Sequence, residues 1–403
     1  MYKQKLRTAC KEAAWVFGLS RLMIFFLSFI SIFLLPRFIP FYKQLLALNE
    51  PYKDDPYGFK AFFFSWFRWD AKSYVNISMQ GYKHTPDVAF FPLWPLIQHF
   101  GSLLLGSIWP GSYYLVGLLL ANICFYFALV LFYCLLAGDF EPRLARRAMI
   151  YLTFGPFALF YFAGYSESLF LLLCIACFLL FRRGRPLDWW LAGFLGFLAT
   201  LTRSAGLMLA VPFLCVCIQR FWLSPEKENY TLFQKLNALT PILLLPLGIV
   251  VYMVYLYNTK GDPFIFQTEE AIVWQRHFSL PWNTLSMMVI ALFTSPSLIM
   301  LALNVIDNSF ALLPLFVLGF GWKRIPLHYA LFALALAAFS MGFPATDIVP
   351  MISQPRLTIV FFPICVILAI WGKNRLFNAF YLSLTLTLLV LNIIMFIGNI
   401  WVA

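Results

Sequence analysis

The stretch Phe67–Pro95 places several ionisable side chains in a chain that is otherwise mostly apolar. It follows the first long apolar segment, and it is too polar to cross a bilayer. Its ionisable residues include Asp70, Lys72, His84 and Asp87. A carboxylate in such a place can accept the proton of an attacking hydroxyl group, and we therefore take Asp70 as the candidate catalytic residue. The alternative is that Asp70 caps a helix over Ala71–Met79, a role that does not exclude catalysis.

Four further segments carry polar residues that our count of membrane spans places on the same side as Asp70. Ionisable groups next to hydrocarbon are costly, so they mark functional sites by default. Arginines there could hold a leaving phosphate, because the guanidinium is always charged and binds in a bidentate manner. A lone carboxylate beside such arginines suits inverting glycosyl transfer from a lipid phosphate-sugar donor. The candidate substrate-binding residues are Trp69, Lys72, His84, Glu167, Arg203, Gln267, Trp274, Arg276 and Arg356.

Each candidate also has a purely structural interpretation. Glu167 and Arg203 end neighbouring spans and could form a structural ion pair. Arg356 starts a span and could be an anchor whose charged head reaches the interface. His84 could be an ordinary loop residue, and Trp274 an interfacial aromatic. Only the gathering of the whole set on one side argues for a reaction centre.

Sequence signals for metal and nucleophile chemistry are missing. The four histidines, His84, His99, His277 and His328, are scattered, and no HExxH motif occurs. The chain has neither a glycine-rich phosphate loop nor a GxSxG elbow. The eight cysteines lie almost all in apolar runs, as small core residues do. We therefore expect no metal and no cofactor, and neither ATP-dependent nor serine-hydrolase chemistry.

The composition defines the elements that must position these residues. Hydrophobic residues make up 62% of the 403 residues and charged residues only 11%, whereas roughly a quarter of a soluble domain is charged. The sequence therefore predicts an all-α, polytopic membrane protein, folded as a single domain over 1–403. The net charge of +12 indicates basic cytoplasmic loops that lie against anionic lipid headgroups, and not a nucleic-acid partner.

Runs of about 20 apolar residues and basic loops on the cytoplasmic side predict about 11 transmembrane helices. The basic N-terminus starts inside, which places a folded first loop, 41–112, on the extracytoplasmic side. We expect one span over Ala148–Ala163 and a second extracytoplasmic insert over 258–303. Thr284–Leu303 in that insert is expected to be re-entrant or interfacial, followed by a span over Ser309–Gly321 that leaves the next basic residues inside.

Five sequence elements, in this order, resemble those of the PIG-V family, which comprises GPI mannosyltransferase 2 and its bacterial relatives. These are integral-membrane glycosyltransferases of the GT-C type. The elements extend along most of the chain. They are Trp69-Asp70-Ala71 with Gly81-Tyr82 and Ala89-Phe90-Phe91-Pro92-Leu93; Phe160–Phe170; Leu201-Thr202-Arg203-Ser204-Ala205-Gly206; Gly261-Asp262-Pro263-Phe264 with Gln267 and Trp274; and Gln354-Pro355-Arg356 with Phe362-Pro363.

The resemblance implies that Asp70 is the catalytic base of an inverting, metal-independent mannosyltransferase. The donor would be a polyprenyl- or dolichyl-phosphate-linked mannose. The chain departs from the family in having Lys72-Ser73-Tyr74 after the Trp-Asp pair, and His84 and Asp87 before the Phe-Phe-Pro element. These departures, and the chain's compactness, favour a bacterial relative without a GPI pathway.

The expected partners are the lipid-linked donor, a lipid or glycan acceptor, and membrane lipids, and we expect a monomer. The expected location is the bacterial plasma membrane, or the endoplasmic reticulum membrane if the source is eukaryotic. The rival hypothesis is a polytopic lipid or sugar transporter or flippase, which would show an internal repeat and charges near mid-membrane. A third is a non-catalytic subunit of a membrane complex. The enzyme hypothesis requires Asp70 to lie close to Arg203 or Arg356 in one cavity on the outer face.

Overall fold

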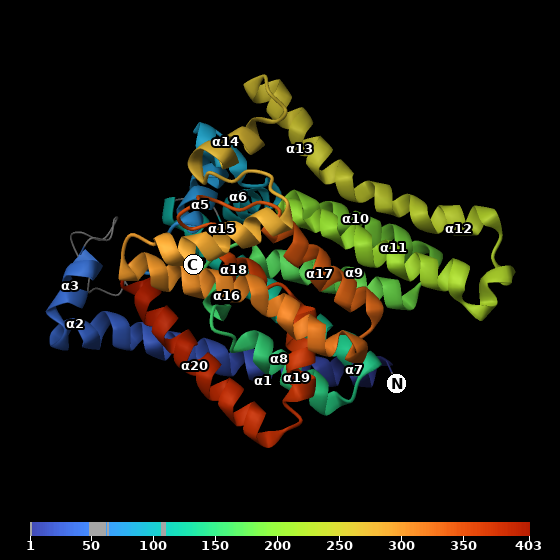
Figure 1. Cartoon of the computed structure of the whole chain (residues 1–403), viewed down its shortest axis with the longest axis horizontal. Coiled ribbons are helices and arrows are strands. Elements are labelled where there is room, and N and C mark those ends of the chain that lie inside the picture. The colour runs from blue at the N-terminus through green and yellow to red at the C-terminus, as the bar shows by residue number, and fades with distance from the viewer. Residues whose placement is uncertain (1, 48–61, 63, 106–109) are drawn as a thin grey trace.

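The computed structural model describes residues 2–47, 62, 64–105 and 110–403, and over these residues it contains helices and turns but no strand (Figure 1). The first half contains α1 (Tyr2–Phe29), α2 (Leu35–Phe38), α3 (Pro40–Ala47), α5 (Asp70–Gln80), α6 (Leu93–Leu104), α7 (Pro110–Asp139), α8 (Pro142–Thr153), α9 (Glu167–Arg183) and α10 (Pro186–Thr202). The second half contains α11 (Ala210–Ile218), α12 (Leu232–Leu239), α13 (Leu244–Lys260), α14 (Ile265–Val273), α15 (Pro281–Thr294), α16 (Leu298–Gly321), α17 (Leu327–Met341), α18 (Gln354–Thr358), α19 (Phe362–Trp371) and α20 (Arg375–Ile397).

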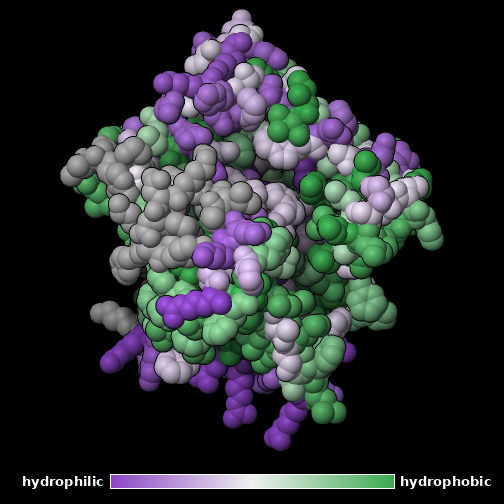
Figure 2. Space-filling model, turned by 90° about the vertical axis from the view of Figure 1, so that its left-hand side faces the viewer, coloured by the Kyte–Doolittle hydropathy of each residue, from purple (hydrophilic) through white to green (hydrophobic). Residues whose placement is uncertain are grey.

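Six helical segments in the described part of the chain are long and apolar enough to cross a membrane. They are Gln4–Phe38, Gly111–Asp139, Ser204–Leu223, Leu232–Lys260, Leu298–Arg324 and Arg375–Ile397, and α17 and α19 are shorter apolar helices. Figure 2 shows hydrophilic residues at the top and bottom of one face, with much hydrophobic surface between them. The predicted all-α, polytopic membrane protein is confirmed, whereas the predicted number of about 11 spans stays a prediction.

Two predicted segments are not continuous helices. Ala148–Ala163 is interrupted because α8 ends at Thr153, and a turn leads to a 3₁₀-helix over Ala158–Tyr161. Pro156 lies in that turn, and proline can neither donate a backbone hydrogen bond nor follow a helical residue without a clash.

The segment Thr284–Leu303 is likewise divided between two helices, because α15 ends at Thr294 and α16 begins at Leu298. Ser297 caps α16 by accepting a hydrogen bond from Met300 N, and Pro296 precedes it. The expected start of the next span at Ser309 is therefore wrong, since that helix begins a full three turns earlier. With 14 residues, α15 is about 21 Å long, which is short of the roughly 30 Å of a bilayer core.

The core is built around α7, which packs against α1, α8 and α9, while α10 packs between α9 and α13. Aromatic side chains also pack on α7; its Phe125 stacks on Tyr161 of the 3₁₀-helix Ala158–Tyr161, with ring centroids 4.4 Å apart. Consecutive helices joined by a short connection run antiparallel, so the start of α9 and the end of α10 lie at the same end of the pair (Figure 1). This places Glu167 and Arg203 side by side.

Candidate active site

Four charged side chains from four segments of the chain form one connected network. Nη1 of Arg356 lies 2.5 Å from Oδ2 of Asp70, and Nη1 of Arg203 lies 2.6 Å from Oε1 of Glu167. Nε of Arg356 lies 3.5 Å from the same Oε1 of Glu167, which joins the two pairs. The network therefore alternates in charge, Asp70–Arg356–Glu167–Arg203, and we call it the charged network.

Asp70 is the first residue of α5, and a strained residue precedes it. Trp69 occupies the N-cap position with φ 41° and ψ −119°, a conformation that costs a non-glycine residue of order 1–3 kcal/mol. Its ring contacts the rings of Phe396 and Trp401, with centroids 4.9 and 5.4 Å apart. The idea that Asp70 is the N-cap is thus wrong, because Trp69 holds that position and the Asp70 carboxylate binds Arg356.

Glu167 is the first residue of α9, and it is almost completely buried, at 1% exposure. The helix N-terminus there favours a carboxylate, since its backbone N–H groups carry partial positive charge. Ser166, just before it, shares a hydrogen bond of 3.0 Å with the hydroxyl of Tyr74 on α5. The two segments that carry Asp70 and Glu167 are therefore tied to each other next to the charged network.

Arg203 ends α10 in an extended conformation, and a 3₁₀-helix over Ser204–Leu209 follows it. Gly206 lies in this turn, and a Cβ atom there would lie 2.5 Å from the backbone of Ala199 and Thr200. The close approach of two backbone segments requires glycine at this position.

We expect Gly206→Ala to lower the free energy of unfolding by about 1–3 kcal/mol through overpacking, and to displace Arg203. Thermal unfolding of the purified protein in detergent measures this change. Gly319→Ala on α16 is the matched control, because a Cβ atom there meets nothing within 4 Å. Equal melting temperatures for the two variants would contradict the packing argument.

Arg356 on α18 is held by charge and by aromatic rings. Its guanidinium carbon lies 5.6 Å from the ring centroid of Tyr165 and 5.9 Å from that of Phe160. Burial by itself lowers the pKa of Arg356, but the carboxylates of Asp70 and Glu167 outweigh it and raise that pKa above its ordinary value. Arg356 is therefore a permanent cation in this site.

Residues 11–276 match the profile of the mannosyltransferase (PIG-V) family. The chain belongs to this family. It is 33% identical over 201 residues to GPI alpha-1,6-mannosyltransferase 2 of Cricetulus griseus, a match that covers 47% of this chain and 40% of that protein. It is 30% identical over 180 residues to GPI mannosyltransferase 2 of Schizosaccharomyces pombe, covering 44% and 37%.

The chain thus aligns with about two fifths of the length of these curated relatives. Among solved structures, an Archaeoglobus fulgidus oligosaccharyltransferase is 12% identical, with a TM-score of 0.44 over 96% of this chain and 55% of that one. A likeness this weak carries no argument about the site.

In this PIG-V family member, the insert after α13 approaches the charged network through aromatic contacts. The ring of Trp274 lies 5.7 Å from that of Phe90, which in turn lies 5.2 Å from that of Tyr74. Arg276 donates hydrogen bonds to the carbonyl oxygens of Phe343 at 3.1 Å and Ile352 at 2.9 Å. Trp274 is therefore near the network, while the guanidinium of Arg276 is directed at backbone oxygens.

Glu270 on α14 is a further carboxylate near the network; the sequence places it in the second insert on the same side as Asp70, but it is not among the predicted substrate-binding residues. Burial raises its pKa, Arg276 opposes this shift, and Asp70 adds to it, with smaller opposing effects from Arg203 and Arg356. Its carboxylate lies 3.9 Å from Nε of Arg276. The adjacent acidic pair Glu269-Glu270 in an apolar chain was the signal that could have drawn attention to it.

The remaining candidates have exposed side chains. Lys72 has an exposed side chain on α5, and Gln267 an exposed one on α14. His84 is exposed before the 3₁₀-helix Thr85–Ala89. No hydrogen bond or ion pair between described residues joins His84 or Gln267 to the charged network. Burial raises the pKa of Asp87, and the charges of His84 and Lys260 oppose that shift.

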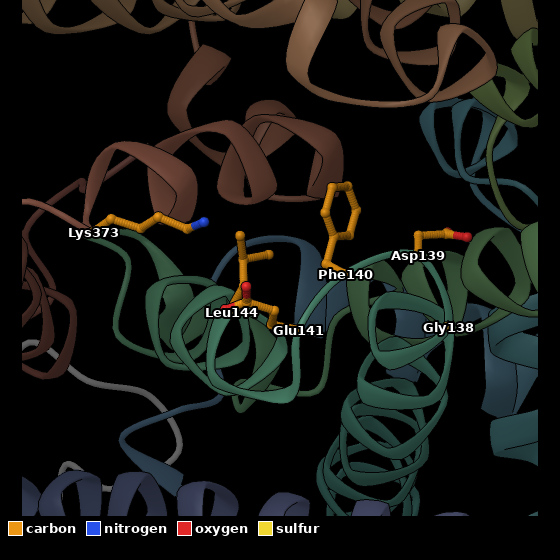
Figure 3. A pocket seen from close by; sticks show the side chains of 6 residues that line it. All are labelled: Gly138, Asp139, Phe140, Glu141, Leu144 and Lys373. Atoms are coloured by element: carbon orange, nitrogen blue, oxygen red, sulfur yellow. The ribbon is translucent and has the colours of Figure 1, made fainter.

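A pocket of about 480 Å³ lies elsewhere, at the last turn of α7 (Figure 3). Its lining residues are Gly138, Asp139, Phe140, Glu141, Leu144 and Lys373. The first turn of α7 lies near the charged network, since Tyr113 O accepts a hydrogen bond from Gln98, which also binds Ser78 of α5. The 30 residues of α7 separate its ends by about 45 Å, so this pocket is not part of the site.

In the described residues, no group of three or more His, Cys, Asp and Glu could hold a metal ion.

Proposed function

We propose that this PIG-V family member is an inverting mannosyltransferase. In this proposal it moves mannose from a polyprenyl- or dolichyl-phosphate mannose to a hydroxyl group of a lipid-linked or glycan acceptor. The observation that carries the proposal is the charged network, because it places the Asp70 carboxylate against Arg356 and joins Arg356 to a second arginine, Arg203, through Glu167. Family membership and the names of the relatives support mannose as the transferred sugar.

Besides the donor and the acceptor, the proposed reaction needs only groups of the charged network. The Asp70 carboxylate accepts the proton of the acceptor hydroxyl as its oxygen attacks C1 of the mannosyl group. The bond from C1 to the phosphate oxygen breaks, and its electron pair leaves with the phosphate. Arg356 and Arg203 bind that phosphate, whose negative charge grows as it leaves. Direct displacement inverts the configuration at C1.

Glu167 serves in this proposal as the buried group that spaces the two arginines. It pairs with both of them through Oε1, and its own exposure of 1% keeps it away from bulk solvent. Trp69, Trp274, Lys72, His84 and Gln267 remain proposed substrate contacts. The aromatic ones are suited to pack against the sugar ring or prenyl chain, and the polar ones to bind its hydroxyls.

We place this site on the extracytoplasmic side, in a single domain over 1–403, with the first loop at 41–112 and the second insert at 258–303. The support is electrostatic: basic residues gather at the opposite end of α7, where Arg146 pairs with Glu12 and Arg182 with Asp139. The short helix α15 is our candidate for the re-entrant or interfacial element of that insert. We further propose a bacterial plasma-membrane location and a monomer. No observation favours the transporter.

The direct test incubates the purified protein with polyprenyl-phosphate mannose and candidate lipid or glycan acceptors, and identifies products by mass. A product heavier than the acceptor by one hexose, with the configuration at C1 inverted, is the expected result. Failure to consume the mannosyl donor with any acceptor would contradict the proposal.

Binding of the donor phosphate gives a separate prediction. We expect Arg356→Gln to weaken the binding of polyprenyl monophosphate by about 10- to 100-fold, the cost of losing a charge-assisted hydrogen bond. Equilibrium binding in detergent or nanodiscs measures it. Unchanged affinity would show that Arg356 does not hold the phosphate.

A further inference from the structure

Four hydrogen bonds join residues 276–279, which follow α14 in the second insert, to the segment that leads into α18. Arg276 Nη1 donates to Phe343 O and Nη2 to Ile352 O, and these bonds are 3.1 and 2.9 Å long. The backbone N–H of His277 donates to Pro344 O at 3.3 Å, and that of Ser279 to Gly342 O at 2.9 Å. Every donor lies in residues 276–279 and every acceptor is a backbone carbonyl of residues 342–352. We call this set the clasp.

The clasp ends next to the residue that binds Asp70. Ile352 is its last acceptor, Ser353 follows with φ 66°, and Arg356 lies in the first turn of α18. A positive φ is strained for serine and fixes the direction in which α18 leaves the segment. The position of Arg356 therefore depends on how the preceding segment is held.

The other end of the clasp is fixed by α14. Gln275, at φ 54°, reverses the chain, and Arg276 N then returns to donate to Glu270 O at 3.1 Å. Glu270 Oε2 faces Arg276 Nε at 3.9 Å, and Trp274 packs on Phe90 of the first loop. The first loop, the insert and the Arg356 segment are thus connected in series.

From this geometry we propose that Arg276 is a positioning residue that acts through Arg356, not a contact to the donor phosphate. Its fork is directed at two carbonyl oxygens nine residues apart in sequence, and its Nε faces a carboxylate. In the described part of the chain, by contrast, the guanidinium groups of Arg356 and Arg203 donate hydrogen bonds only to side-chain carboxylates. This proposal rests on the proposed function for the identity of the ligand, but not for the clasp itself.

A double-mutant cycle tests the proposal, with polyprenyl monophosphate as the probe. We expect Arg276→Gln to weaken its binding about tenfold in the otherwise unchanged protein, as misalignment of one charge-assisted hydrogen bond would. In an Arg356→Gln background the same change should have no further effect, because the group that it positions is gone. In an Arg203→Gln background the tenfold loss should persist. A full further loss in the Arg356→Gln background would overturn the proposal.

Arg276→Lys separates charge from geometry. One ammonium group keeps the charge but cannot reach both carbonyl oxygens in a fork, so we expect a loss like that of Arg276→Gln. Affinity preserved in Arg276→Lys would indicate a direct contact between the cation and the phosphate, and so would overturn the proposal. Arg324→Gln, an exposed arginine that follows α16, is the matched control and should bind normally.

Hydrogen exchange provides a readout that needs neither activity nor ligand. In Arg276→Gln we expect faster amide exchange in 342–356, with no change at the start of α9. Unchanged exchange in 342–356 would contradict the clasp. If the unaltered protein does not bind polyprenyl monophosphate, the proposed function fails, and the exchange result alone decides whether Arg276 holds the Arg356 segment.

Discussion

Asp70→Asn is expected to lower kcat for mannosyl transfer by about 10²–10⁴-fold, the usual contribution of a general base. Asparagine has nearly the shape of aspartate, but its amide cannot accept the proton of the acceptor hydroxyl. The carboxylate that it replaces is partly accessible, with 18% of the side chain exposed. The measurement is single-turnover transfer from polyprenyl-phosphate mannose, with binding of polyprenyl monophosphate measured in parallel.

Asp262→Asn is the matched control for this experiment. Asp262 lies in the second insert, and its Oδ1 accepts a hydrogen bond from Phe264 N that an asparagine oxygen can also accept. We expect turnover close to that of the unaltered protein. Near-normal turnover in Asp70→Asn would remove Asp70 as the base. Loss of phosphate binding together with turnover would instead assign Asp70 to holding Arg356.

Glu167→Ala should lower the free energy of unfolding by about 3 kcal/mol, because it removes the shared partner of two largely buried arginines. The side chains of Glu167, Arg356 and Arg203 are 2%, 14% and 19% exposed. Without Glu167 the two cations repel each other in a site where solvent screens them weakly. Thermal unfolding of the purified protein, at fixed detergent and ionic strength, measures the change.

The control is an ion pair of the same kind at the surface. Glu12 pairs with Arg146, whose side chain is 58% exposed, and such exposed pairs contribute about 0–1 kcal/mol. Glu12→Ala should therefore change the melting temperature much less than Glu167→Ala. Equal shifts in the two variants would show that the charged network adds no more stability than a solvated pair.

The sequence alone determined the class of protein and the main members of the charged network. A chain with few charges and repeated long apolar runs indicates a helical membrane protein, since a helix pairs all its backbone groups within the segment that crosses the lipid. For the same reason Asp70, Glu167, Arg203 and Arg356 stood out, because charges near hydrocarbon are too costly to occur without partners. The motifs around them were also sufficient to indicate the family.

Only the tertiary structure decided which of these groups pair. Asp70 and Arg356 are 286 residues apart, and no local pattern relates residues whose helices meet only after packing. The expectation of a Glu167–Arg203 ion pair agreed with the structure because adjacent antiparallel helices bring those ends together. That Arg356 joins this ion pair to Asp70 depends on where α18 packs, which the sequence does not show. The breaks after α8 and before α16, the place of Glu270 and the direction of Arg276 likewise depend on contacts between distant segments, which periodicity and motif spacing do not contain.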